Sequence, residues 1–242
     1  MKFVDLHIKP STTNLDDIEC IIQSASQLGY SAIGLKISVG LNESVVDQYK
    51  AFAKRHNVDL IKRIDLIPET PRQLLVELNK LRKKYEVISV ECRTKTVSRQ
   101  AAKDHRVDLL NFPLIYPRGL FDRAVAGLAK ASNVAFEVNL MEIIKCREES
   151  LPKVLSEIQR RIWLAEAHKL RIVLSSGAEK PFDLRAPRDL ASFLGLFGLN
   201  EQQMKNSISE IPLSIVHRNR EKLDPSYVDV GIKTVKGASP NG

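Results

Sequence analysis

The 242-residue chain contains few cysteines and no long apolar run. Its three cysteines, Cys20, Cys92 and Cys146, are far apart and form no CxxC pair, so their spacing predicts neither a zinc ribbon nor a disulfide framework. This usage is typical of a reducing, intracellular compartment. No apolar run approaches the roughly 18 residues that cross a bilayer, and no secretory signal is recognisable at the N-terminus. We therefore expect no membrane partner.

Common motifs of nucleotide-binding and hydrolytic enzymes are also absent. No GxGxxG or GxxxxGK[ST] follows a predicted strand, and no GxSxG occurs. Histidine is scarce: of five, only His7 lies at the end of a predicted strand, while His56 and His168 end predicted helices, where the helix dipole favours them. A hydrolytic metal site needs at least three protein ligands, which histidines here do not supply.

Aromatic residues make up only 6% of the chain, and no predicted strand carries the aromatic pair of a ribonucleoprotein sheet. Positive charge is abundant, with a formal net charge of +8 and a pI of about 9.4. This balance favours a polyanionic partner, above all nucleic acid, although solvated lysine-rich helices are the alternative explanation. The combination of few aromatic residues and a large positive charge favours recognition of structured RNA through its shape and phosphates over stacking on single-stranded bases.

Strand-like and helix-like segments alternate along most of the chain, which predicts parallel strands joined by helical crossovers. The predicted strands are residues 3–8, 31–37, 58–66, 87–93, 107–114, 133–140 and 171–178. Seven or eight such units in about 220 residues favour a TIM-like β/α barrel over a doubly wound open sheet. An eighth strand is hard to find, and helical segments follow the seventh. We expect one barrel domain over 1–225 and a loosely ordered tail over 226–242.

Several predicted helices carry recognisable end signals. Asn14 is a predicted N-cap, Asp16 and Asp17 suit the positive end of the same helix, and Gly29 ends it. Another helix is predicted to start at Thr70, with proline at its first position.

Polar side chains gather at the predicted carboxyl ends of the strands, where β/α barrels carry their function. They are Asp5, His7, Lys36, Arg63, Asp65, Glu91, Arg93, Asn111, Glu137, Asn139, Ser175 and Ser176. One interpretation is a catalytic site, and the other is a buried cluster of mutually paired charges that closes the barrel mouth. A magnesium site built from Asp5, Glu91 and Glu137 is a further alternative, which the neighbouring arginines and lysines disfavour.

Basic residues are concentrated in residues 82–106, which hold eight Lys or Arg and three Asp or Glu, a net charge of +5. Further basic residues recur after other predicted strands, whose loops share one end of a barrel. The candidate RNA-binding residues are Lys36, Arg63, Arg93, Lys95, Arg99, Arg106, Arg118, Lys145, Arg147, Lys180, Arg185 and Arg188. Lys83 and Lys84 are interpreted as a solvated helix face.

Four stretches resemble a known family: "FVDLHI", "AFEVNL", "RIVLSSGAEKPFDLRAPRDLASFLGLFGL" and "IVHRNREK". In this order, from Phe3 to about Lys222, they are similar to archaeal ribonuclease P protein component 3, the homologue of the thirty-kilodalton subunit of the human enzyme. The segment from Ser175 through Ala191 is the most specific. The resemblance implies a β/α barrel similar to the polymerase-and-histidinol-phosphatase superfamily of metal-dependent phosphoesterases.

Those phosphoesterases open with a strand of the pattern D-x-H-x-H, and here Lys9 stands at the second histidine position. The resemblance therefore implies a vestigial polar cluster (Asp5, His7, Glu91 and Glu137) and no metal held by the protein. The rival hypothesis is a phosphoesterase that uses these four residues as a reduced metal site.

The resemblance also implies a role in removing the 5′ leader from precursor tRNA. The ribonuclease P RNA performs the Mg²⁺-dependent cleavage, and this chain would support it together with protein component 2 and the other protein subunits, in the cytoplasm. The C-terminal helix residues Leu213, Ile215 and Val216 are candidates for the surface that meets component 2, or else they seal the barrel.

Overall fold

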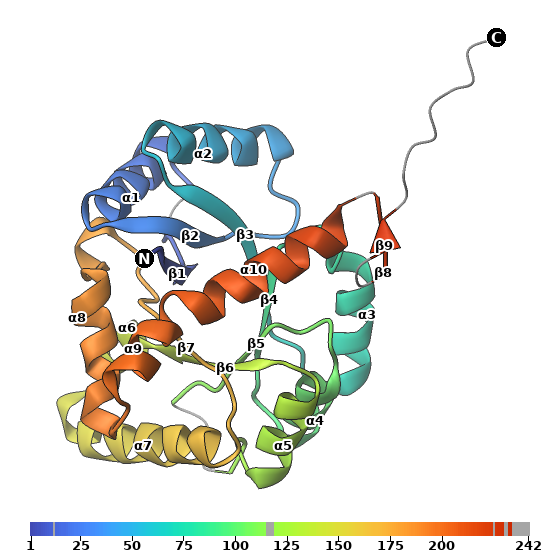
Figure 1. The fold of residues 1–242 in the computed structure, drawn as a ribbon, viewed down its shortest axis with the longest axis vertical. Helices are drawn as coiled ribbons and strands as arrows, with labels where there is room; N and C mark the ends of the chain where they lie inside the picture. Colours follow the sequence, from blue (N-terminus) through green and yellow to red (C-terminus); the bar gives the residue numbers. More distant parts are fainter. Residues whose placement is uncertain (12, 115–118, 225, 230–231, 234–242) are drawn as a thin grey trace.

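The computed structural model describes residues 1–11, 13–114, 119–224, 226–229 and 232–233. Seven parallel strands follow one another around a barrel in chain order, which confirms the predicted TIM-like architecture (Figure 1). The strands are β1 (Phe3–Ile8), β2 (Tyr30–Lys36), β3 (Asp59–Leu66), β4 (Val87–Glu91), β5 (Leu109–Asn111), β6 (Ala135–Asn139) and β7 (Ile172–Ser175).

Helices surround these strands, and their bounds agree with the alternation of the sequence. They are α1 (Leu15–Gln27), α2 (Glu43–Arg55), α3 (Pro71–Leu81), α4 (Lys95–Lys103), α5 (Arg123–Ala131), α6 (Leu140–Ile144), α7 (Leu151–Ala167), α8 (Pro187–Ser192), α9 (Glu201–Ser207) and α10 (Glu210–Leu223). The Asn14 side chain accepts a hydrogen bond from the Asp16 N–H, and the Thr70 hydroxyl accepts one from the Gln73 N–H, so both predicted caps are confirmed. None of the helices in the described ranges is both long and apolar enough to cross a membrane.

The barrel closes directly between β7 and β1, and no described strand is inserted between them as an eighth barrel strand. At the carboxyl end, the Gly177 N–H donates to the His7 carbonyl at 3.0 Å, and the Lys9 N–H donates to the Ala178 carbonyl at 2.8 Å. Ile8 and Ala178 form the corresponding parallel bridge. This closure excludes the open-sheet alternative.

The middle and the amino end of this joint are filled by other groups. One Asp5 carboxylate oxygen accepts hydrogen bonds from the His7 and Ser176 backbone N–H groups, each at 3.1 Å. Below it, the Val4 N–H donates to the carbonyl of Ile208, in the segment between α9 and α10. A carboxylate and a loop carbonyl therefore satisfy backbone groups that a neighbouring strand would normally satisfy. The described part of the chain after α10 forms β8 (Tyr227–Asp229) and β9 (Ile232–Lys233), a small antiparallel pair separate from the barrel, and the rest of the predicted tail lies outside the described residues.

An apolar layer fills the amino-terminal half of the barrel interior. Its strand residues are Val4, Leu6, Ala32, Ile61, Val87, Leu109, Ala135 and Val173. Ile215 and Val216 of α10 are buried in the same layer, and Leu213 packs against it. Figure 1 shows α10 running diagonally across the ring of strands. These helix residues therefore seal the barrel, which was one of the two alternatives for them, and Ile215 and Val216 are not a free surface for a partner.

Ion pairs hold α10 against the amino end of the barrel. Arg218 and Asn219 both donate to one oxygen of the buried Asp108 carboxylate, at 2.7 and 2.8 Å. Arg220 donates to both oxygens of Asp59 and to Glu86. The "IVHRNREK" stretch thus combines apolar residues that seal the barrel with polar residues that fix the helix in place.

Gly34 marks a close approach between two strands inside the barrel. A Cβ atom at this position would lie 2.3 Å from the Leu6 carbonyl oxygen, a distance that no side chain tolerates. The missing side chain leaves room for the Leu6 carbonyl, which accepts a 2.9 Å hydrogen bond from the buried Arg63.

Candidate functional site

Above the apolar layer, the barrel interior becomes polar. We call His7, Arg63, Asp65, Glu137 and Asn139 the polar centre. The centre is organised around Arg63, whose side chain is fully buried. Its two terminal nitrogens donate to the two oxygens of Glu137 at 2.5 and 2.7 Å, and its Nε donates to Asp65 at 2.7 Å. The pair with Glu137 is therefore bidentate, and together with Asp65 it provides acceptors for all three guanidinium nitrogens.

The carboxylates of the centre are held in their charged form. Burial alone would raise the pKa of Glu137, but Arg63 outweighs it and lowers that pKa. Burial is likewise overcome at Asp65, where Arg63, His7 and Lys36 hold the pKa well below its usual range. Two hydroxyls complete the site, because Ser175 donates to Glu137 at 2.8 Å and Ser89 at 3.3 Å.

His7 joins β1 to this cluster through both ring nitrogens. Nδ1 lies 2.7 Å from the Asn139 side-chain oxygen, and Nε2 lies 3.2 Å from an oxygen of Asp65. Burial and the nearby Arg63 would lower the pKa of His7, but the carboxylates of Asp65 and Glu137 reverse this and raise it. Both nitrogens face acceptors, an arrangement that suits the protonated ring and not a metal ligand.

Asp5, predicted as a member of the same cluster, serves the β1–β7 joint instead. It is completely buried, and burial raises its pKa, although hydrogen bonds from Ser176 and His7 oppose the rise. Glu91 also lies apart, at the barrel mouth, where its carboxylate accepts from Arg93 at 2.6 Å. The proposed four-residue cluster is therefore only partly assembled.

These contacts decide between the two interpretations of the polar strand ends. Glu137 is bound to an arginine, Asp5 to backbone amides and Glu91 to Arg93, so the three do not converge on a magnesium ion. Across the residues that the structure describes, no three His, Cys, Asp or Glu side chains are placed to hold a metal. The geometry is that of buried, mutually paired charges.

Arg63 was predicted to bind RNA, and that prediction is wrong. The side chain faces the barrel interior with no exposed surface, because its donors are needed by Glu137 and Asp65. Asp65 was recognised among the polar strand-end residues but was not one of the four residues of the predicted vestigial cluster. The signal was present, since residues two apart on a strand share a face and Asp65 follows Arg63 by two.

Six of the predicted RNA-binding residues lie on or just after the carboxyl ends of the strands. We call this end of the barrel, with its loops, the rim. These residues are Lys36, Arg93, Lys95, Lys145, Arg147 and Lys180. All except the half-buried Lys36 have exposed side chains. Lys145 pairs with Glu179 at 2.8 Å and Arg93 pairs with Glu91, whereas no ion pair links Lys95, Arg147 or Lys180 to another described residue.

The other predicted basic residues are distributed differently. Arg99 is exposed on α4, 3.9 Å from Asp122. Arg106 precedes β5, so it lies at the amino end of the barrel, where Asp104 and Asn79 engage its guanidinium. Its predicted place among the rim residues is wrong, because the chain has already passed along α4 to the opposite end. Arg185 is half-buried and donates to the Phe182 and Leu184 carbonyls, and Arg118 lies outside the described residues.

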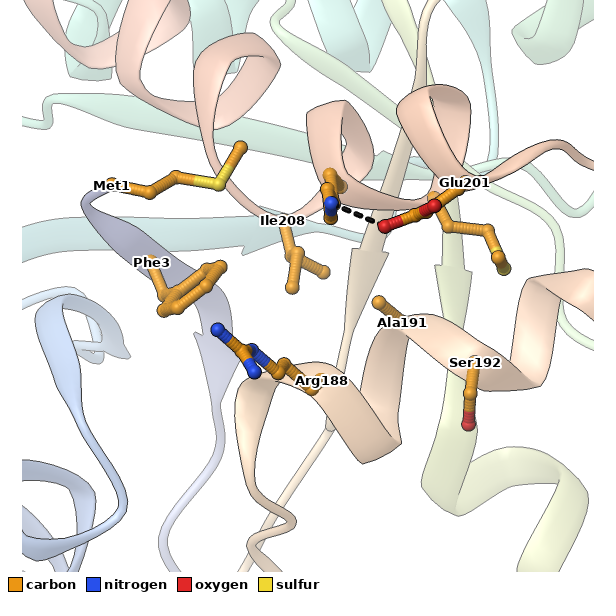
Figure 2. Close-up of a pocket in the computed structure, with 9 residues that line it drawn as sticks. Met1, Phe3, Arg188, Ala191, Ser192, Glu201 and Ile208 are labelled. Atoms are coloured by element: carbon orange, nitrogen blue, oxygen red, sulfur yellow. Dashed lines mark hydrogen bonds and ion pairs between the residues drawn. The ribbon is translucent and has the colours of Figure 1, made fainter.

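Arg188 lies in a pocket on the flank of the barrel, not among the rim loops. The pocket has a volume of about 600 Å³ and is formed by the start of β1, α8, α9 and Ile208. Figure 2 shows the Arg188 and Phe3 side chains next to each other in this pocket. Glu201, which also lines the pocket, pairs with Lys205. The pocket lies beside the start of β1, next to the point where the Ile208 carbonyl accepts from the Val4 N–H.

Comparison with known proteins finds relatives over nearly the whole chain. A curated relative from Methanosarcina barkeri, "Ribonuclease P protein component 3", is 27% identical over 235 residues, covering 97% of this chain and 96% of the relative. The protein of the same name from Methanothermobacter thermautotrophicus is 26% identical, covering 89% of both chains.

Solved structures support the same fold. A chain in the structure titled "cryo-EM structure of archaeal Ribonuclease P with mature tRNA" superposes with a TM-score of 0.83 at 21% identity, covering 98% of this chain and 99% of that one. A putative prolidase from Bifidobacterium longum is a more distant neighbour, with a TM-score of 0.56 at 10% identity, covering 90% and 70%. The family model described as "RNase P subunit p30" matches residues 2–224, and the chain belongs to this family of ribonuclease P protein subunits.

Proposed function

We propose that this subunit supports the catalytic RNA of ribonuclease P in removing 5′ leaders from precursor tRNA, by placing the basic rim against RNA phosphates. The observation that carries the proposal is the separation of charges at the carboxyl end of the barrel. Glu137 and Asp65 in the interior are paired with Arg63 and His7, while Lys95, Arg147 and Lys180 are exposed and have no ion pair to another described residue.

Neutralisation of phosphates explains how such a rim would help. RNA segments that pack together repel one another, and this repulsion is normally relieved by Mg²⁺ and other counterions. Fixed lysine and arginine charges replace part of that counterion atmosphere. The protein should therefore matter most at low magnesium, where the RNA alone folds and cleaves poorly.

The proposed partners are the ribonuclease P RNA, precursor tRNA within the complex, and other protein subunits. The names and titles of the relatives support these partners, since one solved relative is in a complex titled as archaeal ribonuclease P with mature tRNA. Pairing with protein component 2 is the more specific proposal. That the protein itself holds no cofactor, that the Mg²⁺ belongs to the RNA, and that the complex acts in the cytoplasm remain predictions.

The test is cleavage of precursor tRNA with purified components, at magnesium too low for the RNA alone. The double variant Lys95→Ala/Arg147→Ala should lower the protein-dependent rate. It should also reduce the slope of log affinity against log salt by roughly 0.7 to 0.9 for each lost phosphate contact. The control variant Lys83→Ala/Lys84→Ala removes the same charge from exposed residues after α3, at the amino end.

Equal rates in the two variants would refute a role for the rim. Cleavage by the protein without RNA would instead support the phosphoesterase hypothesis, which the paired geometry of Glu137 and Asp65 does not favour.

A further inference from the structure

A small cavity opens at the rim, beside the polar centre, and the charged side chains of its described lining are both lysines. Its volume is about 220 Å³, below the roughly 300 to 1,000 Å³ of pockets that enclose whole drug-sized ligands. Lys9, just after β1, and Lys36, at the end of β2, line it together with Thr13, Ser38 and Tyr49. No carboxylate occurs among the described residues of its lining.

The two lysines are not neutralised equally by their surroundings. Lys9 is exposed and forms no ion pair with a described residue. Lys36 is 28% exposed and lies 3.4 Å from an oxygen of Asp65. That carboxylate is already 2.7 Å from Arg63 and 3.2 Å from His7, so one negative charge is shared among several cationic groups. The cavity therefore keeps a positive excess.

The remaining polar groups of the cavity can donate hydrogen bonds. The Thr13 backbone carbonyl accepts from the Tyr49 hydroxyl at 3.1 Å, which ties the β1–α1 loop to α2. Among the described residues, neither the Thr13 nor the Ser38 side-chain hydroxyl has a hydrogen-bond partner. Two ammonium groups and two hydroxyls around one space match the several acceptor oxygens of a phosphate.

We propose that this cavity binds one phosphate group of an RNA backbone, between Lys9 and Lys36. The inference rests on the proposed function, because it assigns to one RNA phosphate a defined position on the rim. Lys9 stands out because it directly follows β1, the strand that carries His7. A single phosphodiester with its sugar is the ligand that the cavity volume fits. A free phosphate compound shares the same chemistry, and the experiment must separate the two sources.

The first measurement uses the wild-type full-length protein and the rate at which a soluble anhydride acetylates each lysine, read by mass spectrometry. The probes are inorganic phosphate and a short single-stranded RNA oligonucleotide. At an oligonucleotide concentration about four times its Kd, Lys9 and Lys36 should be acetylated about fivefold more slowly. Lys54, which is exposed in a cavity at the amino end, is the internal control and should keep its rate.

The second measurement uses variants and the salt dependence of oligonucleotide binding. Lys9→Gln should reduce the slope of log affinity against log salt by roughly 0.7, the value for one contact to a single strand. Lys9→Arg should restore it, and Lys54→Gln should leave it unchanged. Since Lys9 has no ion-pair partner among the described residues, its variants should fold as the wild type does, which thermal melting checks.

The outcomes separate the alternatives. Protection by inorganic phosphate but not by the oligonucleotide would overturn the inference in favour of a free-anion site. Equal protection of Lys9, Lys36 and Lys54, or no protection, would overturn it outright. If the inference fails while the wild type still accelerates cleavage at low magnesium, the proposed function stands. If that acceleration is absent but Lys9 is protected by the oligonucleotide, the proposed function fails and the phosphate site remains.

Discussion

Removing the charge of Arg63 should destabilise the protein severely, because this side chain neutralises two buried carboxylates. In Arg63→Met, Glu137 would keep only the hydroxyls of Ser175 and Ser89 as donors. Breaking a buried ion pair from one side costs about 3 to 5 kcal/mol. For a chain of this size that lowers the Tm by about 6 to 20 °C. It moves the urea midpoint by about 1 to 2 M at a slope of about 3 kcal/mol per M.

The pH dependence tests the cause of the loss. In the wild type the pKa of Glu137 is lowered, so its contribution to stability is present above the ordinary pKa of 4.5 and is lost as pH falls through the lowered value. Without Arg63, burial alone raises the pKa of Glu137 above 4.5. The stability that Arg63→Met loses relative to the wild type, which we call its deficit, is then small at low pH and grows as pH rises through that raised value. The deficit should therefore be larger at pH 7 than at pH 5.

Urea unfolding of Arg63→Met, Glu137→Met and the double variant at both pH values completes the test. The double variant should recover most of the loss, since replacing both members of a buried pair by apolar groups is often neutral. Asp65 retains His7 and Lys36 as partners in that variant. A cost below about 1 kcal/mol at pH 7, or a deficit that does not shrink toward pH 5, would refute this account of the polar centre.

Three further predictions follow from the same structure. Gly34→Ala should unfold the barrel or lower its Tm by several degrees, because the new Cβ would lie 2.3 Å from the Leu6 carbonyl oxygen, and a thermal melt equal to that of the wild type would contradict this. Asp108→Ala should lower the free energy of unfolding by about 3 to 5 kcal/mol and increase proteolysis near α10, because Arg82, Arg218 and Asn219 all lose an acceptor. An unchanged cleavage pattern would show that apolar packing alone holds the helix. The pKa of His7 is raised, so its contribution to stability is full below the ordinary pKa of 6.5 and is lost as pH rises through the raised value. The difference in unfolding free energy between wild type and His7→Gln should therefore shrink from pH 6 to pH 9. A constant difference would exclude this role of His7.

The sequence was sufficient for the order and type of the elements because those depend on local periodicity. The stripe of Ile18, Ile22 and Ala25 defines the buried face of α1, and Asn14 defines its start. Seven alternating units then leave few architectures apart from a barrel. The end at which each loop lies also follows from order along the chain, which is why Lys95, Lys145 and Arg147 were correctly placed after strands.

The errors concern side chains whose role depends on what lies across the barrel. Arg63 has the same residue type and strand-end position as an RNA-binding residue, but Glu137, 74 residues away, converts it into a buried counterion. Asp5 resembled a member of the polar centre, yet the absence of an eighth strand in the described barrel makes its carboxylate part of the β1–β7 joint. Arg106 was assigned to the rim because it is close in sequence to Arg93, although a helix carries it to the other end.

Composition, periodicity and capping residues thus determined that this chain builds parallel strands with helical crossovers and carries an excess of positive charge. Those properties depend on neighbouring residues or on sums over the chain, so they follow from the linear sequence without knowledge of the fold. Which charges face solvent and which neutralise one another was decided only by the closed barrel, because burial penalties and ion pairing act between residues distant in sequence. The tertiary structure alone also decided that α10 seals the barrel and that a basic cavity lies between Lys9 and Lys36. Each of these features exists only where separate strands and helices meet.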